Sequence, residues 1–183
     1  MLGRILASTS LLVLAACTSN PVLTDFDPAA NFASYRTFAF LEPEPVVARP
    51  ANFNPLIPPR IIDAARRELT AKGLSEASDT SQADLILSFT VGSRDRIDVI
   101  DTGPYYGPGP YGWGAPYYGG TETIQYTEGT LSIDMFDRER KVPVWHGRTS
   151  RTVTQKMREN PSETINEAIG EILADFPPGQ TGS

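Results

Sequence analysis

The residue with the most specific chemistry in this sequence is Cys17, the only cysteine of the chain. It follows Leu14, Ala15 and Ala16, and this order of leucine, two small residues and cysteine is typical of a bacterial lipobox. The thiol at that position takes a diacylglycerol, and cleavage just before it frees an amine for a further acyl chain such as palmitate. We therefore predict that Cys17 is a lipidation site.

The residues before Cys17 have the features of a removable leader. Arg4 gives the start of the chain a positive charge, and the apolar stretch 5–16 is followed at once by the cysteine. At about 12 residues this stretch is too short for a membrane-spanning helix, which needs ~20, but it fits the apolar part of a signal peptide. We expect residues 1–16 to be the signal peptide and residues 17–24 to be a lipidated tether.

The lipid also predicts a location. Two or more acyl chains hold a protein stably at a membrane. Thr18 stands where an Asp would resemble the inner-membrane retention signal. By resemblance to sorted lipoproteins, we expect an anchor in the outer membrane, with the periplasmic face as the default side.

The other reactive side chains give weaker evidence for a particular chemical function. His146 is the only histidine, and with one cysteine in the chain the usual zinc sites of several His and Cys ligands are unavailable. We predict no metal, no cofactor and no catalytic role for His146. Two carboxylates at a suitable separation hydrolyse glycosidic bonds, but any acidic sheet offers such pairs. Here they would come from Asp95, Asp98, Asp101, Glu122 and Glu128.

Residues 103–120 form the most unusual surface segment, because all of them except Ala115 are Gly, Pro, Tyr or Trp. The segment has no helical or strand periodicity, so we expect a loop. Amphipathic aromatic side chains bind proteins, glycans or lipid headgroups at low entropic cost. Equally, the segment fits an insertion without a binding role. The predicted binding residues are Tyr105, Tyr106, Tyr111, Trp113, Tyr117 and Tyr118.

The elements that position these residues follow from hydrophobic periodicity. Strands are expected over 35–41, 83–91, 96–100, 121–137 and 142–153, with a bulge at Gly92-Ser93. A helix is expected over 59–72 and a second one from Asn160, which with Glu163 would form a capping box. Pairing 84–100 with 121–137 as a hairpin at an index sum near 220 places the segment 103–120 at its tip.

This order, β-α-β-β-β-α, predicts an α+β protein. Two helices on one face of an antiparallel sheet is the simplest arrangement that buries both apolar helix stripes, so we expect a two-layer sandwich. The domain should span residues 25–178, followed by a flexible tail over 179–183. Its net charge of −6 argues against a general nucleic-acid binder, which needs a basic surface.

The sequence also resembles the bacterial envelope lipoproteins grouped as domain-of-unknown-function family 4136. The matching stretches are DFDPAANFASYRTFAF (25–40), ADLILSF (83–89), YTEGTLSIDMFD (126–137), VWHG (144–147) and INEAIGEILADFPP (165–178). Members often carry an aromatic, Gly-rich insert between the second and third strands. The family has no established activity, so the resemblance implies a fold and a location only.

Together these observations favour a lipid-anchored cell-envelope protein that is not an enzyme. We expect a binding or assembly module whose partners are the membrane, through its lipid, and an envelope protein or polymer. One alternative is a small periplasmic hydrolase that acts on glycans through carboxylates. The other is a carrier of a hydrophobic ligand, which requires an apolar cavity between sheet and helices.

Overall fold

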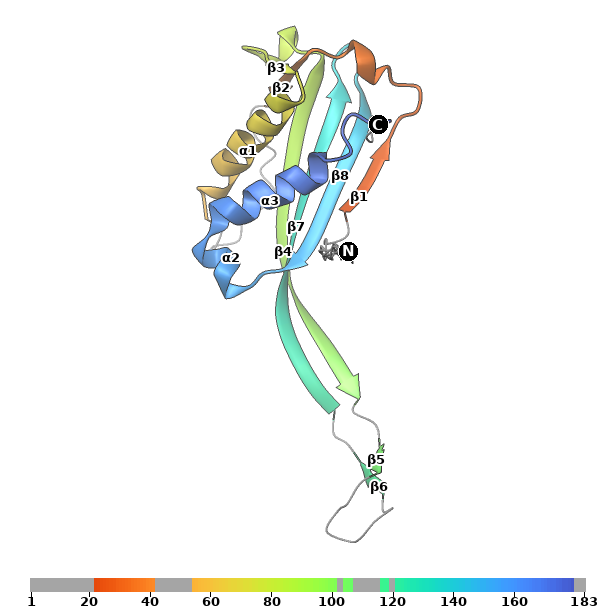
Figure 1. The fold of residues 1–183 in the computed structure, drawn as a ribbon, viewed down its shortest axis with the longest axis vertical. Helices are drawn as coiled ribbons and strands as arrows, with labels where there is room; N and C mark the ends of the chain where they lie inside the picture. The colour runs from red at the N-terminus through yellow and green to blue at the C-terminus, as the bar shows by residue number, and fades with distance from the viewer. Residues whose placement is uncertain (1–21, 42–53, 102–103, 107–115, 119–120, 180–183) are drawn as a thin grey trace, which may run out of the picture.

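A six-stranded sheet, covered by helices on one face, forms the body of the protein, and two of its strands continue far beyond that body (Figure 1). The computed structural model describes residues 22–41, 54–101, 104–106, 116–118 and 121–179. The strands of the main sheet are β1 (Val22–Phe26), β2 (Thr37–Phe40), β3 (Ser75–Glu76), β4 (Leu85–Asp101), β7 (Thr121–Asp137) and β8 (Val142–Thr152). They lie in the order β1-β8-β7-β4-β2-β3.

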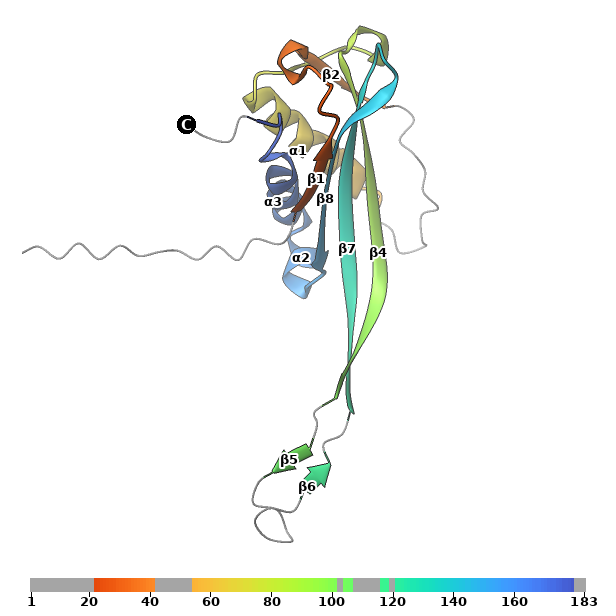
Figure 2. The ribbon, with the colours of Figure 1, turned by 90° about the vertical axis from the view of Figure 1, so that its right-hand side faces the viewer.

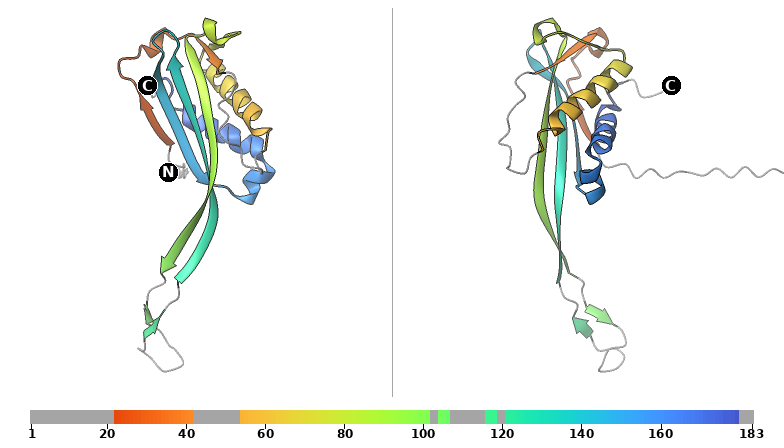
Figure 3. Two further views of the ribbon diagram at one scale, coloured as in Figure 1. Left: turned by 180° about the vertical axis from the view of Figure 1, so that it is seen from behind. Right: turned by 90° about the vertical axis from the view of Figure 1, so that its left-hand side faces the viewer.

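The helices are α1 (Ile57–Ala71), α2 (Gln155–Glu159) and α3 (Pro161–Leu173). Figures 2 and 3 show that all three lie on the same side of the sheet, which confirms the expected two-layer α+β arrangement. Two single turns of 3-10 helix, Phe32–Ser34 and Thr80–Gln82, join strands at one end of the body. The strands β5 (Pro104–Tyr106) and β6 (Pro116–Tyr118) form a separate pair.

The core lies between the sheet and the two long helices. Alternation along the strands turns Leu85, Leu87, Ile133 and Met135 toward the helices, where they are at most 2% exposed. The apolar stripe predicted for α1 is confirmed. The helix begins earlier than expected, at Ile57, because Pro58 stands in the first turn, where no backbone donor is needed. The helix residues that complete the core are Ile61, Ala65, Leu69, Ile165, Ile169, Ile172 and Leu173.

The sheet is mixed, so the expectation of an antiparallel sheet is wrong for one of its edges. β2 runs parallel to both of its neighbours, β3 and β4. The reason is that the chain leaves β2, passes through α1 and returns to the same end of the sheet, as parallel strands require. The predicted element order also lacked β1, β3 and α2.

β1 begins at Val22, inside the segment that the sequence predicted as a tether. It pairs antiparallel with β8, with Val22 opposite Thr149 and Phe26 opposite Trp145. Most of its residues are exposed, so it has no apolar alternation from which to predict a strand. Backbone pairing with β8, rather than burial, defines this edge strand.

The central hairpin is confirmed with a small shift of register. Leu85 lies opposite Asp137, which gives an index sum of 85 + 137 = 222 instead of about 220. A shift by an even number keeps every side chain on its predicted face. The bulge predicted at Gly92-Ser93 is absent, because pairing runs without interruption from Leu85 to Asp101. The irregularity lies elsewhere, between Met135 and Phe136 where β7 meets β8.

The predicted capping box at the last helix is also wrong. Asn160 does precede α3, but its side chain does not cap that helix. The same residue ends α2, and its Nδ2 donates to the Lys156 carbonyl at 3.4 Å. The cap is found one helix earlier, where the Thr154 hydroxyl accepts from the Met157 N–H at 3.3 Å.

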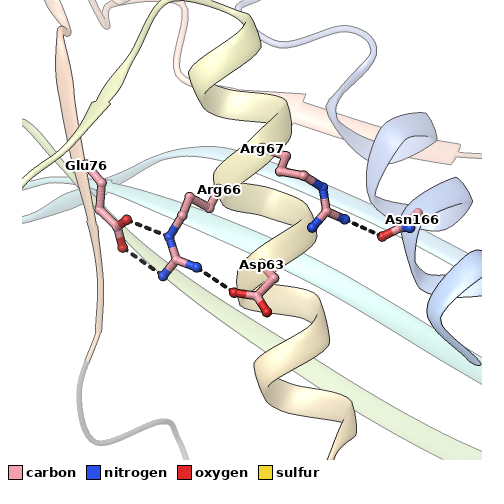
Figure 4. Close-up of polar contacts among 5 residues, drawn as sticks. All are labelled: Asp63, Arg66, Arg67, Glu76 and Asn166. Carbon is pink, nitrogen blue, oxygen red and sulfur yellow. Dashed lines mark hydrogen bonds and ion pairs between the residues drawn. The ribbon is translucent and has the colours of Figure 1, made fainter.

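Polar contacts fix α1 to its neighbours on both sides (Figure 4). The Arg66 guanidinium lies 2.6 Å from Asp63 on its own helix and 2.6 Å from Glu76 of β3. Arg67 donates to the Asn166 side chain of α3 at 2.7 Å. These groups are exposed, so each contact contributes little to stability, but together they set the position of α1 between β3 and α3.

Candidate interaction arm and the cavity at its base

The part of the β4–β7 hairpin beyond the last pair with β8 forms a two-stranded ribbon, which we call the arm. The arm comprises Asp95–Asp101 and Thr121–Thr127, continued by β5 and β6. Figure 1 shows it projecting from the end of the sheet, away from the helices. Pro104 lies opposite Tyr118, and 104 + 118 = 222 equals the index sum of the main hairpin.

Apolar side chains are exposed on both faces of the arm. Residues opposite each other in an antiparallel pair share a face, and alternate residues along one strand do too. Ile97 and Val99 lie on one face and are 62% and 64% exposed. Ile100 and Ile124, on the other face, are 45% and 43% exposed. Four large apolar residues on one narrow ribbon suit a binding surface more than an inert surface.

Cross-strand ion pairs lie at the base of the arm. Glu128, at the base of the arm, accepts from Arg96 at 2.5 Å and lies 3.3 Å from Arg94. Hydrogen bonds from Arg94 and Arg96 hold the pKa of the Glu128 carboxyl below its usual value. Asp95 accepts from the Thr127 hydroxyl at 2.9 Å.

The five carboxylates considered for glycan hydrolysis do not gather in one cleft. Asp95 and Asp101 lie on one face of the ribbon, whereas Asp98, Glu122 and Glu128 lie on the other. The cavity described below has no carboxylate among the described residues that line it. The geometry therefore gives the hydrolase hypothesis no support.

The aromatic segment contains more regular structure than the sequence predicted. Tyr105 and Tyr106 belong to β5, and Tyr117 and Tyr118 to β6, with Tyr105 opposite Tyr117. Part of the expected loop is thus a short hairpin at the tip of the arm. The other predicted site residues, Tyr111, Trp113 and the lipidation site Cys17, lie outside the described residues.

His146 lies on the face of the sheet opposite the helices, and its Nδ1 is 2.6 Å from a carboxylate oxygen of Asp134 on β7. The two residues are cross-strand neighbours and about one-third exposed or more. This contact is an ordinary surface pair. Within the described ranges, no three His, Cys, Asp or Glu residues are grouped so that they could hold a metal ion.

A cavity of about 420 Å³ opens where the arm leaves the body, between the sheet and the N-terminal ends of α1 and α3. It lies between sheet and helices, where a carrier of a hydrophobic ligand would need an apolar cavity. Its apolar lining consists of Ile57, Ile61, Val91, Leu131, Val153, Met157, Pro161, Ile165 and Ala168.

Two polar side chains of β8 interrupt this apolar lining. Thr149 is only 3% exposed, and its hydroxyl has no hydrogen-bond partner among the described residues. Arg151 is 11% exposed; one guanidinium nitrogen lies 2.5 Å from Glu171, while its Nε has no partner within the same residues. This cavity does not follow from any local sequence pattern, because six elements contribute to it. The one sequence signal is that Thr149 and Arg151 occupy inward positions of β8, where apolar residues are expected.

The fold defines an α+β protein with helices on one face of a mixed sheet and a long central hairpin. Residues 22–178 match the family described as Domain of unknown function (DUF4136), and the chain belongs to that family. The matched range includes every helix and strand from β1 to α3. No helix of the described part is long and apolar enough to cross a membrane.

Solved structures share this fold at low sequence identity. A DUF4136 family protein from Bacteroides thetaiotaomicron is 19% identical, with a TM-score of 0.52, and the match covers 86% of this chain and 96% of that one. A PDZ domain protein from Parabacteroides distasonis is 16% identical, with a TM-score of 0.51; the match covers 89% of this chain but 36% of that longer protein. No curated protein matches the chain significantly.

Proposed function

We propose that this protein is a lipid-anchored module of the bacterial envelope that uses its arm to hold a partner protein, without catalysis. Lipid attached at Cys17 would keep it at the outer membrane, on the periplasmic face. The arm would then present a fixed binding surface at a distance from the body.

The observation that supports the proposal is the length of the central hairpin. β4 and β7 have 17 residues each, whereas β8 has 11 and the other strands of the main sheet are shorter still. Ordering a backbone costs about 1–2 kcal/mol per residue, and the arm offsets none of that by contributing to the core. An extension that stays regular and carries exposed isoleucine and valine is best explained by a surface that binds.

A protein partner suits this surface better than a polymer. The outer edge of β4 is paired with β2 only from Leu85 to Leu87, so the backbone of residues 88–100 faces no strand on that edge among the described residues. A free strand edge with alternating side chains is what an added strand of a partner protein recognises. Binding of an envelope polymer to the tyrosines of the tip is the alternative outcome of the test.

The test is to shorten the arm and compare cross-linked partners in intact cells. Replacing residues 97–125 by Asn-Gly joins Arg96 to Tyr126 and keeps the Glu128 ion pairs and the whole core. We expect the shortened protein to unfold at the same temperature as the wild type and to lose its specific protein cross-links. The matched control is Leu56→Ser, which removes an equally exposed apolar side chain from the body. An unchanged cross-link pattern in the shortened protein would refute the proposal.

A further inference from the structure

The arm leaves one strand edge without a neighbour, and the sequence of that edge is complementary to itself. The outer edge of β4 faces no strand over residues 88–100 among the described residues. Within this edge, Ile97 stands between the opposite charges of Arg96 and Asp98. We propose that this edge binds the same edge of a second copy of the chain, in an antiparallel pair about a two-fold axis at Ile97. This interface rests on the proposed function of the arm, for which it supplies the partner.

The backbone of β4 determines which residues can meet across such an edge. The Leu87 carbonyl accepts from the Leu41 N–H at 2.8 Å, so the polar backbone groups of Leu87 point away from β7. These groups alternate in direction along a strand, and pairing with β7 runs without interruption from Leu85 to Asp101. The odd-numbered residues up to Val99 therefore present their N–H and C=O groups to the outer edge. An antiparallel copy of the strand must pair odd residues with odd ones.

Of the registers that satisfy this condition, the one centred on Ile97 joins opposite charges. It places Ile97 opposite Ile97 of the second copy, and it places Arg96 opposite Asp98 on each side of the axis. Arg96 and Asp98 would form the type of pair without backbone hydrogen bonds, whose Cα atoms lie about 4.5 Å apart. Opposite charges that face each other in this way stabilise antiparallel strands, whereas like charges destabilise them.

Other registers and the other edge of the arm lack this complementarity. Centring the pair on any charged residue from Arg94 to Asp98 would place that residue opposite its own copy. Centres at Ser93 and Val99 would bring no opposite charges together. The second free edge of the arm, residues 121–127 of β7, contains no lysine or arginine and cannot form such ion pairs with itself. Charge therefore favours both the β4 edge and the register at Ile97.

The exposed apolar residues of β4 fit the same register. Ile97 is 62% exposed and would contact its own copy across the axis. Ile100 is 45% exposed and would lie opposite Arg94, whose aliphatic stem can cover it. Pairing over residues 94–100 makes a small interface, so we expect a reversible dimer with micromolar affinity rather than a permanent one.

The shape of the molecule leaves room for this pairing. Figures 1 and 2 show that no helix or further strand lies beside the arm. Antiparallel pairing puts the two bodies at opposite ends of the joined arms. The two predicted lipid anchors could then enter one membrane when the joined arms lie along its surface.

Disulfide cross-linking of purified protein tests the register. Residues 18–183 keep the whole hydrophobic core and lack Cys17, so a cysteine introduced on the arm is the only thiol. Ile97→Cys places two thiols across the axis at a Cα separation of about 5.5 Å, within the range for a disulfide. Mild oxidation should link most of this protein into dimers. The matched control is Val99→Cys, because Val99 is 64% exposed but would lie about 13 Å along the strands from its own copy, too far for a disulfide.

Charge reversal tests the ion pairs. Arg96→Asp and Asp98→Arg each create like charges on both sides of the axis, so each variant alone should dimerise at least about tenfold more weakly than the wild type. In an equimolar mixture, the acidic positions of one variant face the basic positions of the other. Sedimentation should therefore show that the mixture dimerises about as well as the wild type. Lys156→Asp, at an exposed position of α2, is the control and should dimerise normally.

The failure of this proposal can be told from the failure of the proposed function. A wild type that stays monomeric at high micromolar concentration refutes the second copy as partner, yet the shortened arm would still lose its cross-links to another protein. Assemblies that grow without limit would mean that unlike edges pair, which also refutes the two-fold interface. Equal cross-linking of Ile97→Cys and Val99→Cys, or a charge-reversed mixture no more dimeric than its components, would refute the register at Ile97.

Discussion

Tyr35 and Asp137 form a partly buried polar pair that links distant parts of the chain. The Tyr35 hydroxyl donates to Asp137 at 2.8 Å, and Asp137 is only 8% exposed. Burial, and then the hydrogen bond to Asp137, raise the pKa of Tyr35 to about 12. Burial also disfavours the charged form of Asp137, but hydrogen bonds from the Arg140 backbone and from Tyr35 outweigh it and lower the pKa of that carboxyl.

This pair predicts a loss of stability at alkaline pH. Tyr35 is neutral in both states below pH ~10, so its full contribution is present there. As pH rises from about 10 to about 12, the tyrosine ionises in the unfolded chain first, and the free energy of unfolding should fall. Tyr35→Phe should be about 1 kcal/mol less stable at neutral pH and should lack this alkaline loss. Urea unfolding at several pH values measures both effects.

Tyr126 is the control for that measurement. The pKa of its hydroxyl is also raised, by desolvation and by Asp98, but Tyr126 stands on the arm rather than in the body. Tyr126→Phe should reduce the alkaline loss less than Tyr35→Phe does, because its hydroxyl stands on the solvent-exposed arm, where solvent screens its interactions. If Tyr126→Phe flattens the alkaline profile and Tyr35→Phe does not, the alkaline loss of stability does not come from Tyr35.

At the scale of elements, Asp84 joins β2 to the start of β4. One of its carboxylate oxygens accepts from the backbone N–H groups of Arg36 and Thr37 and from the Thr37 hydroxyl, all at 2.8–2.9 Å. Burial raises the pKa of Asp84, but these hydrogen bonds outweigh it and hold the pKa below its usual value. This carboxylate thus adds three hydrogen bonds to the backbone pairing at the parallel edge of the sheet.

A lowered pKa in the folded state gives stability that is present above the unfolded value of about 3.8 and is lost as pH falls through the folded value. Asp84→Asn should therefore cost about 1.5–3 kcal/mol at pH 7, and the difference from the wild type should shrink below pH ~4. Thermal unfolding of both proteins across this range tests the prediction. Asp175→Asn, at an exposed position after α3, should change little, and a constant difference down to pH ~2 would contradict the role of Asp84.

The sequence predicted the elements whose side chains alternate between core and solvent. The bounds of β7 were predicted as observed, and the apolar faces of α1 and α3 were correct because each buries one stripe. β1 and α2 were missed because neither buries an apolar face. Gly147 shows the same limit at one position: an added Cβ would overlap the Trp145 ring and lie 2.7 Å from Ile172 of α3, a packing constraint that depends on the folded chain.

The arm could be predicted only in part. Its strands follow from alternation over 121–137, and the index sum came within two residues of the observed one. Its projection beyond the helices does not follow from any local pattern, since it depends on where β8 ends. The cavity was not predictable either, because its lining comes from residues between Asn54 and Ala168 that only the tertiary structure brings together.

At the scale of the whole molecule, the predicted lipid would determine where the arm can reach. From Cys17 to Val22 the chain can extend at most about 18 Å, at ~3.6 Å per residue. The strand from Leu131 to Thr121 is about 33 Å long, at ~3.3 Å per residue. Val22 lies level with Leu131 across the sheet, through Thr149. The strand from Leu131 to Thr121 is thus longer than the segment that would separate Val22 from the membrane. An arm that pointed straight at the membrane would enter the bilayer, so we expect the arm to lie along the membrane surface or to point away from it.

That expectation depends on lipidation, which a labelling experiment checks. Cells fed labelled palmitate should incorporate the label into the wild-type protein. Cys17→Ala should incorporate none and should retain residues 1–16, which mass spectrometry of the purified protein would show. Cys17→Ser gives the same outcome if the thiol is what matters. Label in either variant would show that the acyl group is attached elsewhere.

The pairing of β1 with β8 has a consequence for how the protein reaches its native state. Val22 and Thr149 are 149 − 22 = 127 positions apart in the chain, yet they are neighbours in the sheet. Contacts between such distant positions slow folding, because a long loop must close before they form. The strand that is synthesised first is therefore among the last to be placed. Until β8 is available, the β1 segment stays unpaired, and any binding partner that meets the chain during this interval meets an incomplete sheet.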